Sequence, residues 1–321
     1  MALALNALFN KRARALTRAK LRAWWEGEVF DEEAALAEIA ANDPGGADDA
    51  LFDPPEPALA PRLAALGLLW GENRVRPGDE AADAAEAGRI GAPADGRIAV
   101  LGPGLAAPVL AFAAAHPGPL EVFEWREETL ERLKYGLVKA KLEGRVTVTR
   151  IDLEAHVFPQ AHYDGLWSVD DFAYCSFPPH LAHQIMKALK PGAAALVESY
   201  HGVRIAEFAT AFASSFAEPQ VRAHGDLLQV FADTGLQMEA DDDLTDLFLA
   251  MARKQFKSLS ARMEEAAKLD VAAVQELAWE AEAWRMRLTL LASRRLERRR
   301  FLLRRPAEAQ SEAENANAPQ G

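Results

Sequence analysis

From Arg97 onward, short apolar segments alternate with amphipathic ones, and this alternation restricts the fold more than any other feature of the sequence. Apolar runs predict strands at residues 98–101, 120–123, 146–151, 163–169 and 193–197. Most of the segments between them have helical spacing. Continuous apolar strands that alternate with helices indicate a parallel sheet covered on both faces. We therefore expect an α/β fold with a doubly wound, mostly parallel sheet, an N-terminal helical extension and a helical insertion near the C-terminus.

Proline and glycine cluster in residues 43–61, which is typical of a linker or irregular loop. We expect residues 1–65 to form the helical extension and this linker. Residues 66–306 would form the main domain, in which 244–296 is a helical insertion that caps the substrate. Residues 307–321 are polar, and we expect them to be disordered.

The charge of the chain limits the classes of partner that it could bind. The net charge of −12 argues against nucleic acid, whose phosphates attract basic proteins. Residues 1–25 nevertheless hold six basic residues and no acidic one. We interpret them as a helix that docks on the main domain; the alternatives are an organelle-targeting helix, or one that makes peripheral membrane contact.

Few features address the compartment or a metal. The single cysteine, Cys175, fits a reducing compartment, and we expect a cytoplasmic protein. No apolar run approaches the ~20 residues that span a bilayer. His180 and His183 lie three residues apart, but no further ligands follow at matching spacing, so we expect no metal.

The ends of the first two predicted strands carry residues suited to a nucleotide-like ligand. In an open parallel sheet, ligands bind beyond the carboxyl ends of the strands. The first strand ends in Gly102-Pro103-Gly104, where glycine lets the backbone approach a ligand and the next helix offers its N–H groups. The second strand ends in Glu124, which could accept hydrogen bonds from ribose hydroxyls. We expect Glu124→Ala to lose ligand affinity without unfolding the domain.

The next two strand ends continue the pattern. Asp152 and Leu153 follow the third strand and suit the amino group and ring face of adenine. Asp170 follows the fourth strand. Each residue also has an ordinary explanation, namely a strand-to-helix turn, a solvated strand end or a helix cap. Their occurrence at successive strand ends favours a binding site.

These segments carry a family resemblance. The chain resembles class I S-adenosylmethionine-dependent methyltransferases over about residues 66–306, and in particular small-molecule enzymes of the phosphoethanolamine type. The matching segments are Ile98–Ala106, Tyr163–Ser168, Leu189–Ala193 and Arg300–Pro306. The resemblance implies S-adenosylmethionine as the cofactor, with Glu124 as its ribose-binding acid and Asp152 as its adenine-side acid. The candidate cofactor-binding residues are Gly102, Gly104, Glu124, Trp125, Asp152, Leu153 and Asp170.

The resemblance implies methyl transfer to a small-molecule or lipid acceptor. Such a reaction needs an acceptor held in line and sometimes a base. The candidate catalytic residues are His201 and Tyr200, just after the fifth strand. Two departures leave an alternative open: Val100 replaces an acid common in the first motif, and Ala106 replaces its third glycine. The alternative is a catalytically degenerate protein of this fold that acts as a binding or regulatory subunit.

Overall fold

The computed structural model describes residues 31, 34, 56–202 and 220–307, and it divides the chain into two compact units, Met1–Pro55 and Glu56–Gly321. In the first unit, the backbone N–H of Ala34 donates to the side chain of Asp31 at 3.0 Å. The predicted helix of residues 1–25, with its alternative membrane contact, lies outside the described residues. So does the predicted tail, except for Ala307.

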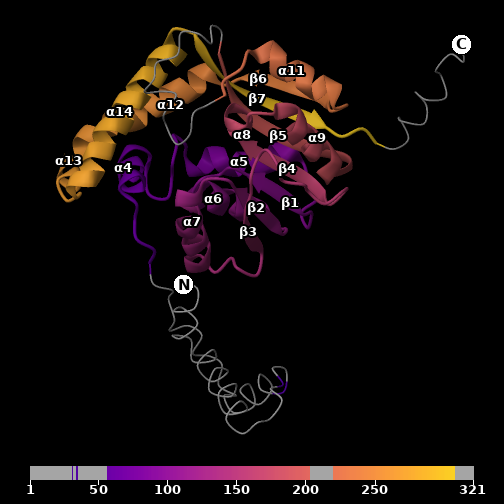
Figure 1. Cartoon of the computed structure of the whole chain (residues 1–321), viewed down its shortest axis with the longest axis horizontal. Coiled ribbons are helices and arrows are strands. Elements are labelled where there is room, and N and C mark those ends of the chain that lie inside the picture. Colours follow the sequence, from indigo (N-terminus) through magenta and orange to yellow (C-terminus); the bar gives the residue numbers. More distant parts are fainter. Residues whose placement is uncertain (1–30, 32–33, 35–55, 203–219, 308–321) are drawn as a thin grey trace, which may run out of the picture. The chain divides into compact units, whose positions relative to one another are not determined.

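The second unit is built on a seven-stranded sheet in the order β3-β2-β1-β4-β5-β7-β6 (Figure 1). Its first five strands pair in parallel, whereas β7 lies antiparallel between β5 and β6. The strands are β1 (Ile98–Leu101), β2 (Leu120–Glu124), β3 (Val146–Arg150), β4 (Tyr163–Val169), β5 (Leu189–Gly202), β6 (Gln237–Asp243) and β7 (Leu296–Arg304). The predicted doubly wound, mostly parallel sheet is confirmed.

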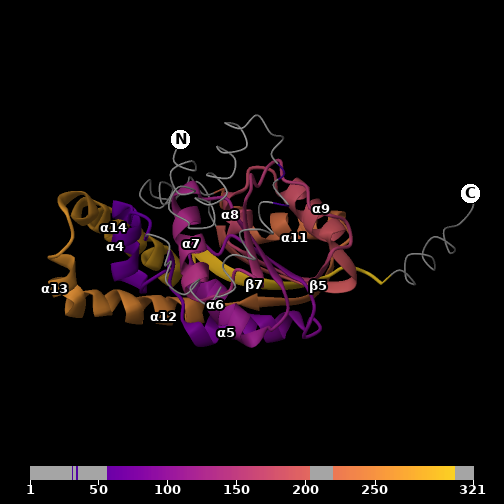
Figure 2. The same ribbon diagram turned by 90° about the horizontal axis from the view of Figure 1, so that it is seen from below.

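Helices cover both faces of this sheet (Figure 2). Successive side chains of a strand point to opposite faces, so Val100 and Trp167 pack into one core, and Leu101 and Leu166 into the other. The first core is covered by α5 (Glu80–Ile90), α6 (Ala106–Ala115) and α7 (Glu127–Lys139), and the second by α9 (Pro178–Ala188) and α11 (His224–Asp233).

A third cluster of helices lies at one end of the sheet in both Figure 1 and Figure 2. It consists of α4 (Pro61–Trp70), α12 (Thr245–Lys257), the short α13 (Met263–Ala266) and α14 (Val271–Ala292). Trp70 of α4 meets Trp284 of α14 edge to face, with ring centroids 4.5 Å apart. The same apolar core includes Leu105, which follows β1, and Tyr200, near the carboxyl end of β5, so these helices cap the carboxyl edge of the sheet. The helical insertion expected near the C-terminus is therefore present.

Local sequence explains where several of these helices begin. Asp79 and Asp270 accept backbone hydrogen bonds at the starts of α5 and α14, as N-cap residues do. The helix α9 begins at Pro178. Proline is tolerated there because the N–H groups of the first helical turn form no hydrogen bond within the helix.

Within the described ranges, no helix has both the length and the apolar composition that a membrane span requires.

Candidate functional site

The turn after β1 requires its two glycines. Gly102 and Gly104 have φ angles of 63° and 82°, in the left-handed region that favours glycine. A Cβ atom at Gly102 would overlap the carboxylate of Asp171, and one at Gly104 would overlap the side chain of Val75. The close approach that the glycines permit is therefore made by the chain's own side chains.

Glu124 lies beside this turn at the end of β2 and is fully buried. Its carboxylate accepts hydrogen bonds from the backbone N–H of Gly104 at 2.7 Å and of Arg126 at 2.8 Å. The guanidinium of Arg126 adds an ion pair at 3.0 Å. The carboxylate thus ties the glycine turn to the start of α7, and its burial rules out the ordinary alternative for Glu124, a solvated strand end.

Arg126 fills the space next to the glycine turn. Its guanidinium lies 3.9 Å from the centroid of the Trp125 ring, a cation–π geometry, and donates to the carbonyl oxygen of Gly102 at 3.3 Å. Burial alone would lower the pKa of Arg126, but the surrounding acidic groups, with Glu124 first among them, together outweigh it and raise that pKa overall. Arg126 therefore remains charged inside the site.

The end of β4 contributes two buried aspartates. Asp170 adopts a left-handed conformation with a φ of 67° and pairs with the fully buried guanidinium of Arg298. Arg298 also binds Glu198 at 2.7 Å. Asp171 accepts hydrogen bonds from the Ser168 hydroxyl at 2.7 Å and the Trp125 indole at 3.0 Å. Burial raises the pKa of Asp171 to about 7.

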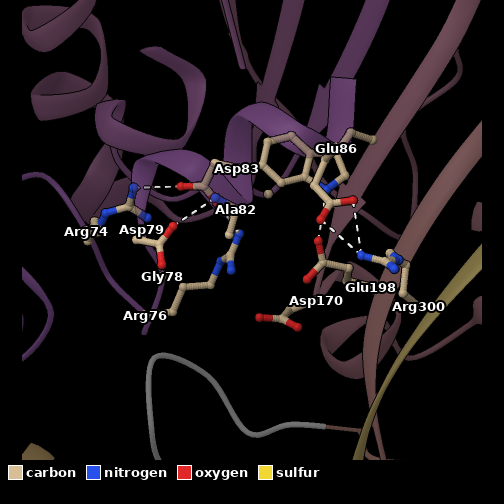
Figure 3. A network of polar contacts seen from close by, with 12 residues as sticks. Arg74, Arg76, Gly78, Asp79, Ala82, Asp83, Glu86, Asp170, Glu198 and Arg300 are labelled. Atoms are coloured by element: carbon tan, nitrogen blue, oxygen red, sulfur yellow. Dashed lines mark hydrogen bonds and ion pairs between the residues drawn. The ribbon is translucent and has the colours of Figure 1, made fainter. Parts of the chain in front are cut away.

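A network of charged side chains continues from these aspartates toward α5 (Figure 3). Arg74 pairs with Asp83 at 2.6 Å, and Arg300 pairs with Glu86 at 3.1 Å. Burial raises the pKa of Glu86 to about 7, with a further contribution from the nearby charge of Glu198. The network fixes α5 and the loop before it against the end of the sheet.

A small cavity of about 20 Å³ remains between the sheet end and the capping helices. A space of this size holds roughly one water molecule. Its lining residues are Val75, Arg76, Arg126, Asp170, Tyr174, Tyr200, Trp284 and Arg287.

Within the described part of the chain, no group of three or more His, Cys, Asp or Glu side chains could hold a metal ion.

The predicted site residues divide into three groups. Gly102, Gly104, Glu124 and Trp125 form one connected cluster through Arg126, and Asp170 lines the small cavity beside Arg126 but is bonded to Arg298. Asp152 lies after β3 and is exposed, and its carboxylate accepts from the backbone N–H of Glu154 at 2.9 Å. Leu153 is buried in the core on the α9 side of the sheet.

The two candidate catalytic residues lie on opposite faces of β5, because neighbouring side chains alternate along a strand. Tyr200 lines the small cavity. His201 packs with Phe301 and His224 in the opposite core, at ring-centroid distances of 5.4 and 5.6 Å. Burial lowers the pKa of His201 to about 3. The two residues therefore do not act on one site.

Sequence reasoning missed Arg126, Arg298 and the Val75–Arg76 segment as parts of this site. Arg126 stands two residues after the predicted ribose acid, a place where its charge could have been noticed. Arg298 lies in a run of basic residues near the C-terminus, and in the structure Arg298, Arg299 and Arg300 of this run all form internal ion pairs. Nothing in the sequence signals that Val75 covers Gly104.

This strand order, with its antiparallel seventh strand and its glycine turn after β1, defines the class I methyltransferase fold. No family model and no curated protein matches the chain. Solved structures do match. A phosphoethanolamine N-methyltransferase 2 from Haemonchus contortus, in complex with phosphomonomethylethanolamine and S-adenosylhomocysteine, aligns with a TM-score of 0.66 at 20% identity over 76% of this chain and 57% of that one.

Two further structures show how widely the fold is used. The [4+2]-cyclase SpnF aligns with a TM-score of 0.63 at 16% identity, over 77% of this chain and 93% of its own. The cyclopropane synthase MmaA2 from Mycobacterium tuberculosis aligns with a TM-score of 0.60 at 15% identity, over 70% and 83%. The chain spans little more than half of the Haemonchus enzyme. At these identities the likeness establishes the fold, and function has to be argued from the site.

Proposed function

We propose that this chain binds S-adenosylmethionine at the carboxyl ends of β1, β2 and β4 and transfers its methyl group to a small-molecule or lipid acceptor. The observation that carries the proposal is Glu124, a carboxylate at the end of β2 bonded directly to the glycine turn of β1. In doubly wound sheets the acid after the second strand binds the ribose of a nucleotide-like ligand, and the glycine turn after the first strand lets the ligand approach the backbone. The Haemonchus enzyme, of the same fold, was solved with S-adenosylhomocysteine.

The residue types fit this cofactor, but its volume requires movement. Glu124 offers acceptors for ribose hydroxyls, Trp125 offers an apolar face for adenine, and Asp152 could accept from its amino group. Leu153 is buried and would have to be uncovered to meet the adenine ring. The cavity of about 20 Å³ is far smaller than the cofactor. In our proposal, Arg126 leaves Glu124 and the Val75 segment shifts away from Gly104 as the cofactor binds.

The chain's own residues would act mainly by positioning. When bound, S-adenosylmethionine supplies an electrophilic methyl group. Burial raises the pKa of Tyr200, so its phenol stays protonated at neutral pH and serves as a hydrogen-bond donor to the acceptor. The capping helices α4 and α14 exclude water and hold the acceptor in line, which alone can supply a large part of a rate enhancement. We assign His201 a packing role in this scheme because it lies across the sheet from the cavity.

One observation favours a second candidate, a degenerate protein of this fold that binds a partner and does not catalyse. Glu124 already has three donors, and the space beside the glycines is filled. Val100, which stands where an acid is common in the family, is buried in the apolar core beneath the turn. A site occupied in this way by its own side chains is what loss of cofactor binding would produce.

Calorimetric titration of the full chain with S-adenosylmethionine and S-adenosylhomocysteine separates the two candidates. Micromolar binding of either, about −8 kcal/mol, supports the methyltransferase proposal. Glu124→Gln should weaken that binding, whereas Glu131→Gln, an exposed change on α7, should not. If neither compound binds a well-folded chain, the first proposal is wrong and the binding-protein proposal gains support.

The nature of the acceptor needs a separate measurement. Co-sedimentation with vesicles that contain anionic lipid tests both a lipid acceptor and the membrane contact predicted for residues 1–25. Binding by the full chain that is lost when residues 1–25 are removed supports membrane contact. If the intact chain stays in the supernatant, the lipid alternative is excluded and a small-molecule acceptor is favoured.

A further inference from the structure

The cavity beneath the capping helices is lined mainly by hydrogen-bond donors. Three arginines reach it from different parts of the chain: Arg76 from the loop after α4, Arg126 from the start of α7, and Arg287 from α14. The cavity also contains one carboxylate, Asp170, which is paired with Arg298 outside the lining, just as Arg126 is paired with Glu124. Three guanidiniums line the cavity against one carboxylate. The surface offered to a ligand is therefore cationic.

Arg76 has the least complete set of partners. It is only 9% exposed, yet its Nε and Nη2 atoms donate no hydrogen bond to any residue in the described ranges. Its nearest carboxylate, Asp83, lies 3.8 Å away and is bonded more closely to Arg74, at 2.6 Å. In Figure 3 the Arg76 guanidinium lies between that pair and Asp170. A buried guanidinium with unused donors is costly unless a ligand completes its bonds.

Tyr200 adds a second incomplete donor. Its hydroxyl is buried and, among the described residues, has no hydrogen-bond partner. Two guanidiniums lie near its ring, that of Arg298 at 4.7 Å and that of Arg287 at 5.9 Å from the ring centroid. Arg287 also lies 4.3 Å from the centroid of the Trp284 ring. These cation–π contacts place the Arg287 charge and the Tyr200 ring side by side at the cavity.

We propose that this cavity binds the anionic group, a carboxylate or a phosphate, of the acceptor molecule, with Arg76, Arg287 and Tyr200 as its donors. Planar guanidiniums are suited to both anions because they donate two parallel hydrogen bonds. The present volume admits one terminal oxygen, so the rest of the acceptor extends toward the glycine turn. The identification of the ligand as the methyl acceptor rests on the proposed function, but anion binding at this site can be tested without it.

The test uses inorganic phosphate and sodium acetate as probes on the full chain. Each is titrated at constant ionic strength, with and without saturating S-adenosylhomocysteine, and binding is followed by calorimetry. We expect at least one of the two anions to bind, and to bind whether or not S-adenosylhomocysteine is present. The preferred probe identifies the acceptor's anion as a phosphate or a carboxylate.

Variants assign the site to its residues. Arg76→Gln and Tyr200→Phe should each weaken anion binding about tenfold or more, as expected for a lost hydrogen bond to a charged group. Arg76→Lys should retain part of the affinity. The matched control is Arg285→Gln, two residues from Arg287 on α14 but exposed, and it should bind as the parent does. Tyr200→Phe removes one oxygen only and so guards against loss of folding.

The outcomes separate this inference from the proposed function. If phosphate and acetate both fail to bind, or if Arg285→Gln weakens binding as much as Arg76→Gln, the anion site is refuted. If S-adenosylhomocysteine competes with the anion, the site belongs to the carboxylate of the cofactor and the acceptor assignment is wrong. If the anion binds through Arg76 but S-adenosylhomocysteine does not bind at all, the anion-site proposal is supported and the methyltransferase proposal is wrong.

Discussion

The carboxylate of Glu124 accepts a hydrogen bond of 2.7 Å from the backbone N–H of Gly104, which joins the end of β2 to the glycine turn after β1. In proteins of this fold, a ligand bound at the carboxyl ends of the strands contacts both elements, and this hydrogen bond lies where it would do so. Glu124 therefore has two roles: it stabilises the glycine turn, and it would have to exchange partners when a cofactor binds.

Glu124→Ala should destabilise the domain, which corrects the expectation from the sequence that this change spares the fold, because the carboxylate is buried and bonded. The change leaves the N–H of Gly104 and the charge of Arg126 buried without their acceptor, so we expect the free energy of unfolding to fall by about 3–5 kcal/mol. Urea denaturation measures it. Glu131→Ala, an exposed change on α7, should stay within about 0.5 kcal/mol of the parent. A Glu124→Ala protein as stable as the parent would contradict the burial of this carboxylate.

Arg126→Met should increase cofactor affinity while it lowers stability. It frees the Glu124 carboxylate for a ribose, and we expect about tenfold tighter binding of S-adenosylhomocysteine, the worth of one charge-assisted hydrogen bond. The free energy of unfolding should fall by only about 1–3 kcal/mol, because two backbone donors still reach Glu124. Calorimetry and urea denaturation check the two parts.

The control for Arg126→Met is Arg150→Met, whose exposed pair with Glu127 at 3.0 Å should contribute about 0.5 kcal/mol at most. Weaker cofactor binding by Arg126→Met would mean that the guanidinium is part of the bound state. In that case Arg126 would be a cofactor ligand and would not compete for Glu124.

Gly136→Ala should reveal how the chain accommodates Ala106 in place of a glycine. A Cβ at Gly136 on α7 would lie 2.5 Å from the Cβ of Ala106. We expect a loss of about 1–3 kcal/mol from overpacking, although alanine favours the helix by about 1 kcal/mol. Thermal denaturation of a double-mutant cycle with Ala106→Gly should show that the second change restores the stability lost.

Gly88→Ala is the matched control for that cycle, because a Cβ at this helical glycine of α5 meets no atom within 4 Å. It should stabilise the protein by up to about 1 kcal/mol. If Gly136→Ala behaves like Gly88→Ala, the contact between α6 and α7 is looser than described.

Asp171→Asn should change the pH dependence of stability. Burial raises the pKa of Asp171 to about 7, so the folded parent binds a proton that the unfolded chain releases near pH 4. Stability from this group is present at low pH and is lost as the pH rises toward 7. The asparagine does not titrate, so its stability relative to the parent should rise between pH 5 and pH 8, by up to about 3 kcal/mol.

The measurement is urea denaturation of both proteins at the two pH values. Other groups with raised pKa, such as Glu86, are present in both proteins and cancel in the difference. A difference that stays constant from pH 5 to pH 8 would show that Asp171 is ionised throughout.

The sequence predicts the sheet well because the signal is local. Each apolar run between Arg97 and Val197 matches a strand, and their alternation with helices fixes parallel pairing. The edge strand β6 was harder to predict, since its residues are largely exposed and acidic and pair with the arginines of β7. Its pattern carries charge in place of the apolar alternation that identifies a strand.

The candidate site was less predictable, because its contacts join distant parts of the chain. Arg298 meets Asp170 across 128 positions, and no local pattern indicates that pairing. The burial of Glu124 depends on Arg126 folding back over it, which follows from side-chain packing alone. Periodicity located the strand ends, but it could not tell which residues there face a ligand and which bind each other.

The place of β7 in the sheet has a consequence for biosynthesis. It lies between β5 and β6, so β6 has no neighbour in the sheet until residues 296–304 have been made. Until then a nascent chain would carry an open edge on β5 together with an unpaired β6, and unpaired strand edges promote aggregation. We therefore expect ribosome-bound chains that end within α14 to depend on chaperones, and release of the final strand to act as the step that commits the domain to its native state.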